Sequence, residues 1–203
     1  ITRRLKEAGF PRVKTLEEFT YERAPDLPQA LIAELNSGEY ITRAQGVIFV
    51  GDPGTGKTHL ATALGVAACR QGRSTRFVTA ANLVNDLVEA KDSRALGATV
   101  RRYARCELLV IDDLGYLPLA NHEAELLFQV FAERTERGSI IITTNLPFSE
   151  FTKIFQDKRL CAAVLDRITH NAHIIDTGTD SKRTPLTIPK MRRVKAVEIS
   201  VPL

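Results

Sequence analysis

The sequence has no long apolar run and little cysteine. No run of about 18 apolar residues occurs, which argues against a membrane span, and no signal peptide is visible at its start. The three cysteines, Cys69, Cys106 and Cys161, are far apart and form no CxxC pair. This spacing argues against a metal site and predicts buried, reduced thiols in a cytoplasmic protein.

Other missing signatures narrow the function. The sequence contains no [NT]-K-x-D guanine motif, and no acceptor-substrate pocket can be read from it, which argues against a GTPase and a small-molecule kinase. It has no helix-turn-helix or zinc signature, so nothing supports sequence-specific DNA readout. The net charge of +4 over 203 residues allows a polyanionic partner without requiring one.

The pattern that is present is that of an α/β protein. Short apolar runs at 46–50, 75–80, 107–112, 139–145 and 172–176 alternate with segments of helical periodicity. Helices are expected at 28–35, 58–72, 81–91, 94–105, 122–138, 147–155 and 161–171, after a loop-like lead-in. The alternation predicts a parallel sheet with helices on both faces, which binds ligands beyond the carboxyl ends of its strands.

A phosphate-binding loop follows the first of these strands. The segment GDPGTGKT, Gly51 to Thr58, fits G-x-x-x-x-G-K-[ST] and lies between a strand and a helix, as this motif requires. Its glycines allow backbone N–H groups to surround a phosphate chain at a helix N-terminus. Lys57 would bridge the terminal phosphates, and the Thr58 hydroxyl would hold Mg²⁺. The residues expected to contact ATP here are Gly51, Asp52, Pro53, Gly54, Thr55, Gly56, Lys57 and Thr58, with His59 beside them.

Two adjacent carboxylates end the third strand. Asp112 lies at the end of a strand parallel to the one before the loop, where it could bind Mg²⁺ directly or through water. Asp113 would face the attacking water as a general base, or it could cap the following turn. Because Asp is one methylene shorter than Glu, slow hydrolysis is expected.

Two further residues are candidates for the same reaction. Asn145 ends the fourth strand, where it could orient the attacking water, although Asn is common at strand ends. Arg167 lies on a later helix, where an arginine is usually solvated. It becomes functional only if a neighbouring subunit presents it to bound nucleotide, as an arginine finger does.

The remaining candidates concern DNA, metals and adenine. A basic set in the two helices between 80 and 105 could neutralise DNA phosphates or could be a solvated face, with Arg94, Arg101 and Arg105 on one side by helical spacing. His170 and His173 have no further ligands near them in the sequence, so they do not predict a metal site. Phe19 and Tyr21 could stack near adenine or pack in the core. The basic set is Lys91, Arg94, Arg101, Arg102 and Arg105.

Together these segments resemble a known family. GVIFVGDPGTGKTHLATALG, LLVIDDLGYLPL, ELLFQVFAERTERGSIIITTNLPFSE and AAVLDRITHNAHIID look like the IstB transposition helper ATPases. These are AAA+ proteins similar to the DnaC helicase loader and the DnaA initiator. The resemblance covers about residue 8 to residue 183, and several motifs match in order and spacing.

The resemblance implies a P-loop ATPase fold of AAA+ type with a five-stranded parallel sheet. It implies a linker at 1–45, an ATPase core at 46–176 and a reduced C-terminal lid with an atypical tail at 177–203. Gly51 to Thr58 would be Walker A and Asp112 with Asp113 Walker B. By the same resemblance Asn145 would be sensor 1, Arg167 an arginine finger acting in trans, and Arg183 sensor 2. The helices at about 80–105 would match the initiator-type insertion, which touches DNA in relatives.

The chain departs from the family at both ends. Its first residue is Ile1 rather than Met, and the small helical domain with which relatives begin is missing, so we expect an N-terminally truncated form. Lys182 stands where relatives have an aromatic residue, and the tail contains three prolines, so a reduced lid with an atypical tail is expected here. The expected function is a Mg²⁺-ATP-dependent ATPase that forms a homo-oligomeric ring or spiral on duplex DNA and serves a transposase. A replicative helicase loader and an assembly module with negligible turnover are the alternatives.

Overall fold

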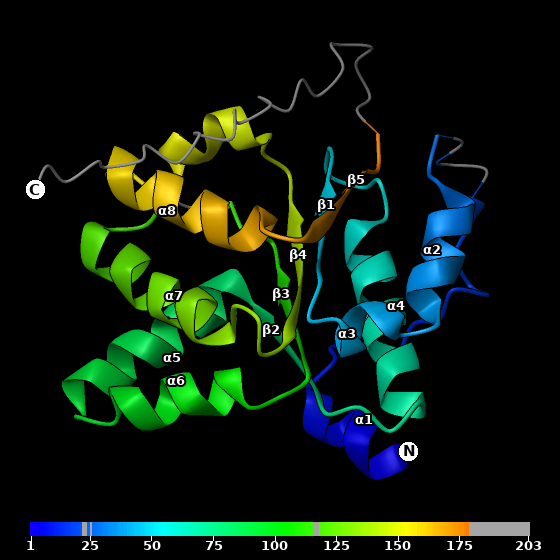
Figure 1. The fold of residues 1–203 in the computed structure, drawn as a ribbon, viewed down its shortest axis with the longest axis horizontal. Coiled ribbons are helices and arrows are strands. Elements are labelled where there is room, and N and C mark those ends of the chain that lie inside the picture. Colours follow the sequence, from blue (N-terminus) through cyan, green and yellow to red (C-terminus); the bar gives the residue numbers. More distant parts are fainter. Residues whose placement is uncertain (22–23, 25, 116–117, 179–203) are drawn as a thin grey trace, which may run out of the picture.

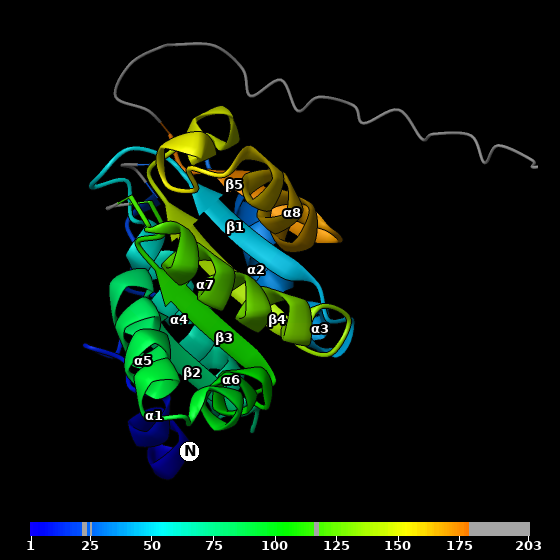
Figure 2. The same ribbon diagram turned by 90° about the vertical axis from the view of Figure 1, so that its left-hand side faces the viewer.

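The five apolar runs form a single parallel sheet in the computed structural model, which describes residues 1–21, 24, 26–115 and 118–178. The strands are β1 (Gly46–Val50), β2 (Thr75–Thr79), β3 (Leu108–Asp112), β4 (Ser139–Thr144) and β5 (Ala172–Asp176). Their order is β2-β3-β4-β1-β5, and Figure 2 shows them side by side. The predicted α/β fold with a five-stranded parallel sheet is therefore confirmed, with strand bounds within one residue of the prediction.

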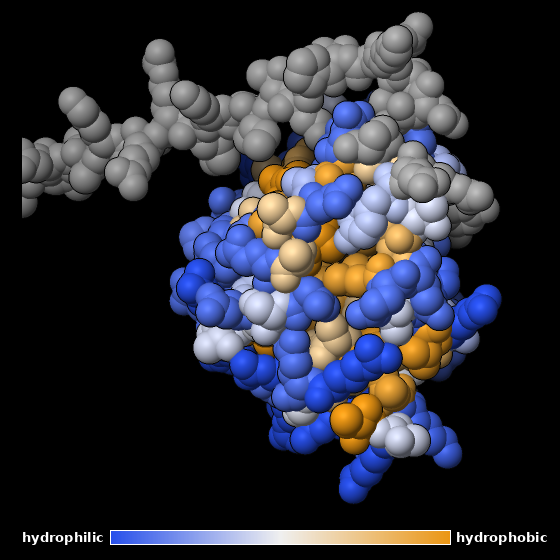
Figure 3. Space-filling model, turned by 90° about the vertical axis from the view of Figure 1, so that its right-hand side faces the viewer, coloured by the Kyte–Doolittle hydropathy of each residue, from blue (hydrophilic) through white to orange (hydrophobic). Residues whose placement is uncertain are grey.

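Helices cover both faces of this sheet. On the right in Figure 1 lie α2 (Gln29–Asn36), α3 (Glu39–Thr42) and α4 (Lys57–Arg70). On the left lie α5 (Ala80–Asp92), α6 (Leu96–Ala104), α7 (Asn121–Arg134) and α8 (Lys158–Thr169), with the 3-10 helix η2 (Phe148–Lys153). Figure 3 views the side of α2 and α4, where hydrophilic residues surround scattered apolar patches.

Alternate residues of each strand enter two separate cores. In β1, Val47 and Phe49 pack with α2 and α4, whereas Ile48 and Val50 pack with α5, α7 and α8. Because both faces are buried, the strand reads as a continuous apolar run rather than as an alternation. In the sheet the carboxyl end of β1 lies next to that of β4, and the end of β3 lies one strand further on.

The lead-in differs from the loop expected there. Residues Thr2–Ala8 form α1 and Glu39–Thr42 form α3, two helices too short to show a clear periodicity in sequence. Phe10 packs on Phe77, with ring centroids 5.9 Å apart, and on Gly65 of α4, where an added Cβ would lie 2.9 Å from the ring. The lead-in is thus attached to the helix that follows the phosphate loop.

Two helix predictions also need correction. The helix expected at 122–138 ends at Arg134, because Thr135 leaves the helical region at φ −54° and ψ 127°. Arg134 itself is fully buried, and its guanidinium donates to backbone carbonyls that include those of Tyr103 and Ser139. The helix expected at 147–155 is the 3-10 helix η2.

Candidate nucleotide-binding site

The phosphate loop lies at the carboxyl end of β1 and leads into α4, which begins at Lys57. Gly51, Gly54 and Gly56 have φ values of 156°, 87° and 92°, which L side chains rarely adopt. A Cβ on Gly51 would overlap the Thr177 hydroxyl, and a Cβ on Gly56 would lie 2.6 Å from the Phe19 ring. Glycine is therefore required at both positions by conformation and by space.

Lys57 turns back over this loop. Its Nζ donates to the carbonyl oxygens of Gly51 at 2.8 Å and Asp52 at 2.7 Å, and the residue is 6% exposed. Burial lowers the pKa of the ammonium, and the charges of Asp113, Asp52 and Asp112 oppose this shift. The carbonyls are neutral acceptors, so phosphate oxygens could replace them with a stronger, charge-assisted interaction.

The Asp112 carboxylate lies beside the first turn of α4. Its Oδ1 accepts hydrogen bonds from the Thr58 hydroxyl at 3.0 Å and from the Thr143 hydroxyl at 2.6 Å. Burial raises the pKa of this carboxyl, as does the charge of Asp113, while the two hydrogen bonds and Lys57 act in the opposite direction. A hydroxyl and a carboxylate in contact are the hard oxygen donors that Mg²⁺ prefers, so Thr58 and Asp112 fit this cation.

Asp113 lies just beyond β3 in the left-handed region at φ 59°, and it is exposed. Its backbone N–H donates to the Thr143 hydroxyl at 2.9 Å. Asn145 follows the last residue of β4 and is exposed at the same edge of the sheet. The roles of Asp113 as general base and Asn145 as water-orienting group stay predictions.

Two threonines that the sequence did not single out belong to this site. Thr143 contacts both aspartates, and the Thr177 hydroxyl lies 2.7 Å from that of Thr55 in the loop. The Asp52 N–H donates to Gly178 O at 3.2 Å, so the chain after β5 supports the loop from the side. In the sequence, a threonine in or just after an apolar strand is explained by its preference for β-strands. No motif or spacing in the sequence indicates that these two threonines contact the site.

Arg167 lies at the opposite edge of the sheet. It is exposed in the last turn of α8 and lines a cavity of about 220 Å³ with residues at the starts of β1 and β4, such as Gly46 and Ile140. The phosphate loop follows the other end of β1, so Arg167 lies away from the loop of its own chain. Arg183 falls outside the described residues.

The lead-in contacts the start of α4 through aromatic rings. Phe19 packs edge-on against Tyr21, with centroids 4.9 Å apart, and against His59, with centroids 5.3 Å apart. The His59 Nε2 lies 2.8 Å from Thr15 O, so the imidazole is engaged with the lead-in. The contacts of His59 and of the aromatic pair with a nucleotide stay predictions.

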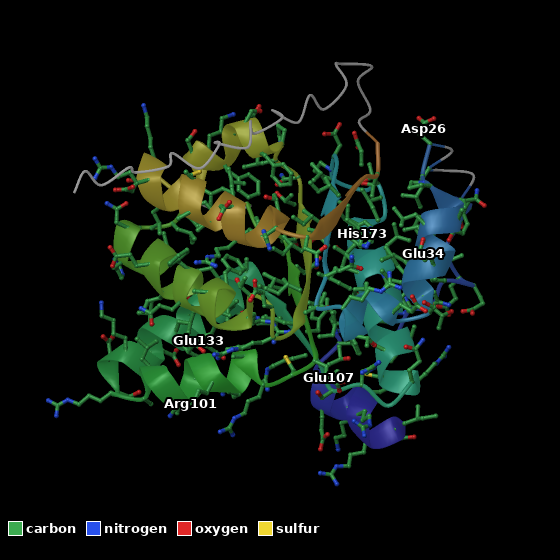
Figure 4. The ribbon with its side chains drawn as sticks, in the orientation of Figure 1. Asp26, Glu34, Arg101, Glu107, Glu133 and His173 are labelled. Atoms are coloured by element: carbon green, nitrogen blue, oxygen red, sulfur yellow. The ribbon has the colours of Figure 1, made fainter. Side chains whose placement is uncertain are left out.

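The basic set on and beside α5 and α6 is less regular than its spacing predicted. Arg94 precedes α6, at φ 59°, so its predicted place on one helix face with Arg101 and Arg105 is wrong. Arg102 donates to Asp86 Oδ2 at 2.7 Å and stacks over the Tyr103 ring. All five members of the set are exposed: Lys91, Arg94, Arg101, Arg102 and Arg105. Figure 4 shows Arg101 on α6, at the lower left of the view.

Within the described residues, no group of three or more His, Cys, Asp and Glu side chains could hold a metal ion. His173, labelled in Figure 4, lies 3.3 Å from Gln45 Oε1 through its Nε2. In the same part of the chain, no helix has the length and apolar character needed to cross a membrane.

Comparison with known proteins agrees with this geometry. A family model described as IstB-like ATP binding protein matches residues 1–187. The ATP-binding protein of insertion sequence IS232 from Bacillus thuringiensis is 36% identical, over 88% of this chain and 72% of that protein. The corresponding protein of insertion sequence IS21 from Pseudomonas aeruginosa is 37% identical, over 89% of this chain and 68% of that protein.

Solved structures agree with the fold. AMPPCP-bound DnaA from Aquifex aeolicus has a TM-score of 0.68 at 21% identity, over 83% of this chain and 50% of that chain. The DnaC helicase loader has a TM-score of 0.62 at 23% identity, over 85% of this chain and 99% of that chain. The sheet with its phosphate loop therefore has the fold of these DnaA and DnaC structures. By its sequence match, its fold and its loop geometry, the chain belongs to the family of IstB-like ATP binding proteins.

Proposed function

We propose that this chain is a Mg²⁺-dependent ATPase that assembles on duplex DNA without strong sequence preference and regulates or recruits a transposase. The observation that carries the proposal is the meeting of Lys57, Thr58 and Asp112 at one edge of the sheet. Bound Mg²⁺ would supply charge stabilisation on the phosphates. Lys57 would hold the terminal phosphates, and Thr58 and Asp112 would hold the cation.

Hydrolysis would then depend on a second copy of the chain. Arg167 is exposed at the edge of the sheet opposite its own loop, which supports a role on the nucleotide of a neighbouring subunit. The exposed arginines Arg101 on α6 and Arg105 at its C-cap support contact with phosphates rather than bases. Insertion-sequence relatives support a transposase as the client.

The first test is steady-state ATP hydrolysis with and without long duplex DNA. DNA should raise the rate of the parent chain, whereas Arg167→Ala should fall by about a hundredfold or more while still binding ATP. Arg137→Ala is the matched control, because Arg137 is an exposed arginine whose partner is Glu133 of its own chain. Equal rates for the parent and Arg167→Ala, with no DNA effect, would contradict the oligomeric switch.

A mixing experiment tests whether Arg167 acts between subunits. Lys57→Ala subunits lack the phosphate contact but keep Arg167, and Arg167→Ala subunits have the reverse defect. In an equal mixture, about a quarter of the interfaces combine an intact loop with an intact arginine, so activity should return. A mixture as inactive as its two components would mean that Arg167 does not act in trans.

One observation favours a second candidate, an assembly module in which ATP is structural and turnover is negligible. Asp113 is short, exposed and turned out of β3, which is a weak arrangement for a general base. Comparing the lifetime of DNA-bound assemblies on ATP and on a non-hydrolysable analogue separates the two functions. Equal lifetimes would favour the module, and a shorter lifetime on ATP would favour the ATPase.

A further inference from the structure

The Thr143 hydroxyl lies between the two aspartates that follow each other at the end of β3. Thr143 is fully buried in β4. Its Oγ1 donates to Asp112 Oδ1 at 2.6 Å and accepts the Asp113 N–H at 2.9 Å. Its backbone carbonyl accepts the Leu114 N–H at 2.9 Å. One residue of β4 therefore binds three consecutive residues of the neighbouring chain segment.

These hydrogen bonds begin where the regular backbone pairing between β3 and β4 ends. The last register pair between β3 and β4 is Ile111 with Ile142. Beyond it the chain turns into the left-handed region at Asp113, which is unfavourable for a residue with a side chain. The hydroxyl and carbonyl of Thr143 take the N–H groups of Asp113 and Leu114, which would otherwise lose their partners as the chain leaves the sheet.

The directions of the hydrogen bonds follow from chemistry. A carboxylate only accepts and a backbone N–H only donates, so the hydroxyl must donate to Asp112 and accept from Asp113. Valine has the same shape as threonine and can do neither, whereas serine can do both. The site thus requires a hydroxyl at this position, and not merely a β-branched residue of the right size.

We propose that Thr143 is a positioning residue for ATP hydrolysis, one that sets the orientation of the Asp112 carboxylate and the direction in which Asp113 leaves the strand. Thr58, the other hydroxyl donor to Asp112, is half-buried in the first turn of α4, on the ligand side. Thr143 lies in the sheet and is the fixed member of the pair. The inference rests on the proposed function, because the two aspartates must act on metal and water.

The test compares Thr143→Val, Thr143→Ser and a matched control in the same hydrolysis assay. We expect Thr143→Val to lower kcat by about ten- to a hundredfold, as loss of a residue that orients a metal ligand does, with KM for ATP changed by less than about twofold. The Mg²⁺ concentration for half-maximal rate should rise. Thr143→Ser should recover most of the rate, within about threefold of the parent.

Ser139→Ala is the matched control. Ser139 is a buried hydroxyl residue at the other end of β4, whose Oγ donates to Tyr40 O at 3.1 Å. It reports the cost of removing a buried hydroxyl from this strand away from the aspartates, and its kcat should stay near that of the parent. If Thr143→Val does not fold, Thr143→Cys replaces it, because a thiol is a weaker donor and acceptor, and its kcat should lie below that of Thr143→Ser.

Several outcomes would overturn the inference. A parent-like kcat for Thr143→Val, equal losses in Thr143→Val and Thr143→Ser, or an equal loss in Ser139→Ala would leave Thr143 as a packing residue only. If the parent chain itself hydrolyses no ATP with DNA, the proposed function fails. The Mg²⁺-dependent gain in ATP affinity then decides, because Thr143→Val should lose that gain and Thr143→Ser should keep it.

Discussion

Two buried cations lie at opposite edges of the sheet, and they are held in different ways. Lys57, 6% exposed, donates to two carbonyls of the loop that it closes and lies near the charges of Asp113, Asp52 and Asp112. Arg134 is 0% exposed. Its guanidinium donates to the carbonyls of Tyr103, Ala104, Cys106, Glu107 and Ser139.

The difference agrees with the proposed role of Lys57 on phosphates and with a structural role for Arg134. The acceptors of Lys57 belong to a segment with three positive-φ glycines, and an incoming phosphate can replace them. The acceptors of Arg134 belong to the end of α6, the start of β3 and the start of β4, which the guanidinium joins together. A planar fork with five N–H donors suits that task, whereas a single ammonium suits the loop.

The largest effect on stability is expected at Arg134. Arg134→Met should lower the free energy of unfolding by about 4 kcal/mol, because several buried carbonyls would lose their donor. Urea denaturation followed by circular dichroism measures this change. Arg137→Ala, which removes an exposed i,i+4 pair with Glu133, should cost less than about 0.5 kcal/mol. Similar losses of unfolding free energy for Arg134→Met and Arg137→Ala would contradict the structural role of Arg134.

A smaller loss is expected in the phosphate loop. Gly56→Ala should cost about 2 kcal/mol, because alanine is strained at φ 92° and its Cβ would meet the Phe19 ring. Gly54→Ala is the matched variant: its φ is 87° and no atom lies within 4 Å of the added Cβ. It should cost only about 1 kcal/mol, from backbone strain alone. Equal losses of stability for the two variants in thermal melts would mean that the Phe19 ring moves aside without a free-energy penalty.

Lys57→Met should change stability by less than about 1 kcal/mol, because relief of the unfavourable burial of the ammonium offsets the loss of its bonds to two loop carbonyls. The same variant should lose ATP binding, measured by titration with a fluorescent ATP analogue. Lys153→Met, an exposed lysine paired with Glu150, should bind ATP like the parent. A Lys57→Met protein as unstable as Arg134→Met would make the two cations equivalent and contradict the distinction.

The smallest expected effects concern the pH dependence of stability. They should differ between Glu107, just before β3, and Asp112, its last residue. Burial would raise the pKa of Glu107, but hydrogen bonds from Arg73 and Ser74 outweigh it and hold the pKa below its ordinary 4.5. Burial raises the pKa of Asp112 above its ordinary 3.8. The folded protein therefore binds the Glu107 proton less readily than the unfolded chain does, and the Asp112 proton more readily.

The two variants should consequently have opposite pH dependences. Above pH 4.5 the parent should be more stable than Glu107→Gln, by less than about 1 kcal/mol because the side chain is 41% exposed. This difference should be lost as pH falls through the lowered pKa of Glu107. Relative to Asp112→Asn, the parent should gain stability as pH falls through the raised pKa toward 3.8. Urea titrations of the metal-free proteins across this pH range measure both stability differences. If the two differences changed with pH in the same direction, the opposite pKa shifts of Glu107 and Asp112 would be contradicted.

Much of the fold could be predicted because its signals are local. The apolar runs of β1 to β5 and the glycine pattern of Gly51 to Thr58 each lie within a few residues. The meeting of Thr58 with Asp112 followed from one topological rule, since parallel strands bring their carboxyl ends to one edge.

The rest depends on contacts between distant segments. Arg134 reads as a solvated last-turn arginine, and only the packing of α6 against the starts of β3 and β4 buries it. Thr143 reads as an ordinary strand residue until the left-handed turn at Asp113 brings an N–H to its hydroxyl. Arg94 shows the opposite error, because the predicted helix began at this residue, whereas α6 begins at Leu96 and Arg94 lies in the left-handed region before it.

The strand order has a consequence for synthesis on the ribosome. β1 carries the phosphate loop, but its neighbours in the sheet are β4 and β5, which are translated much later. Until Asp176 has left the exit tunnel, one edge of β1 has no partner, and Thr177 cannot yet support the loop. A nascent chain therefore cannot complete its ATP site early, and folding of that site is delayed until most of the described chain has been made.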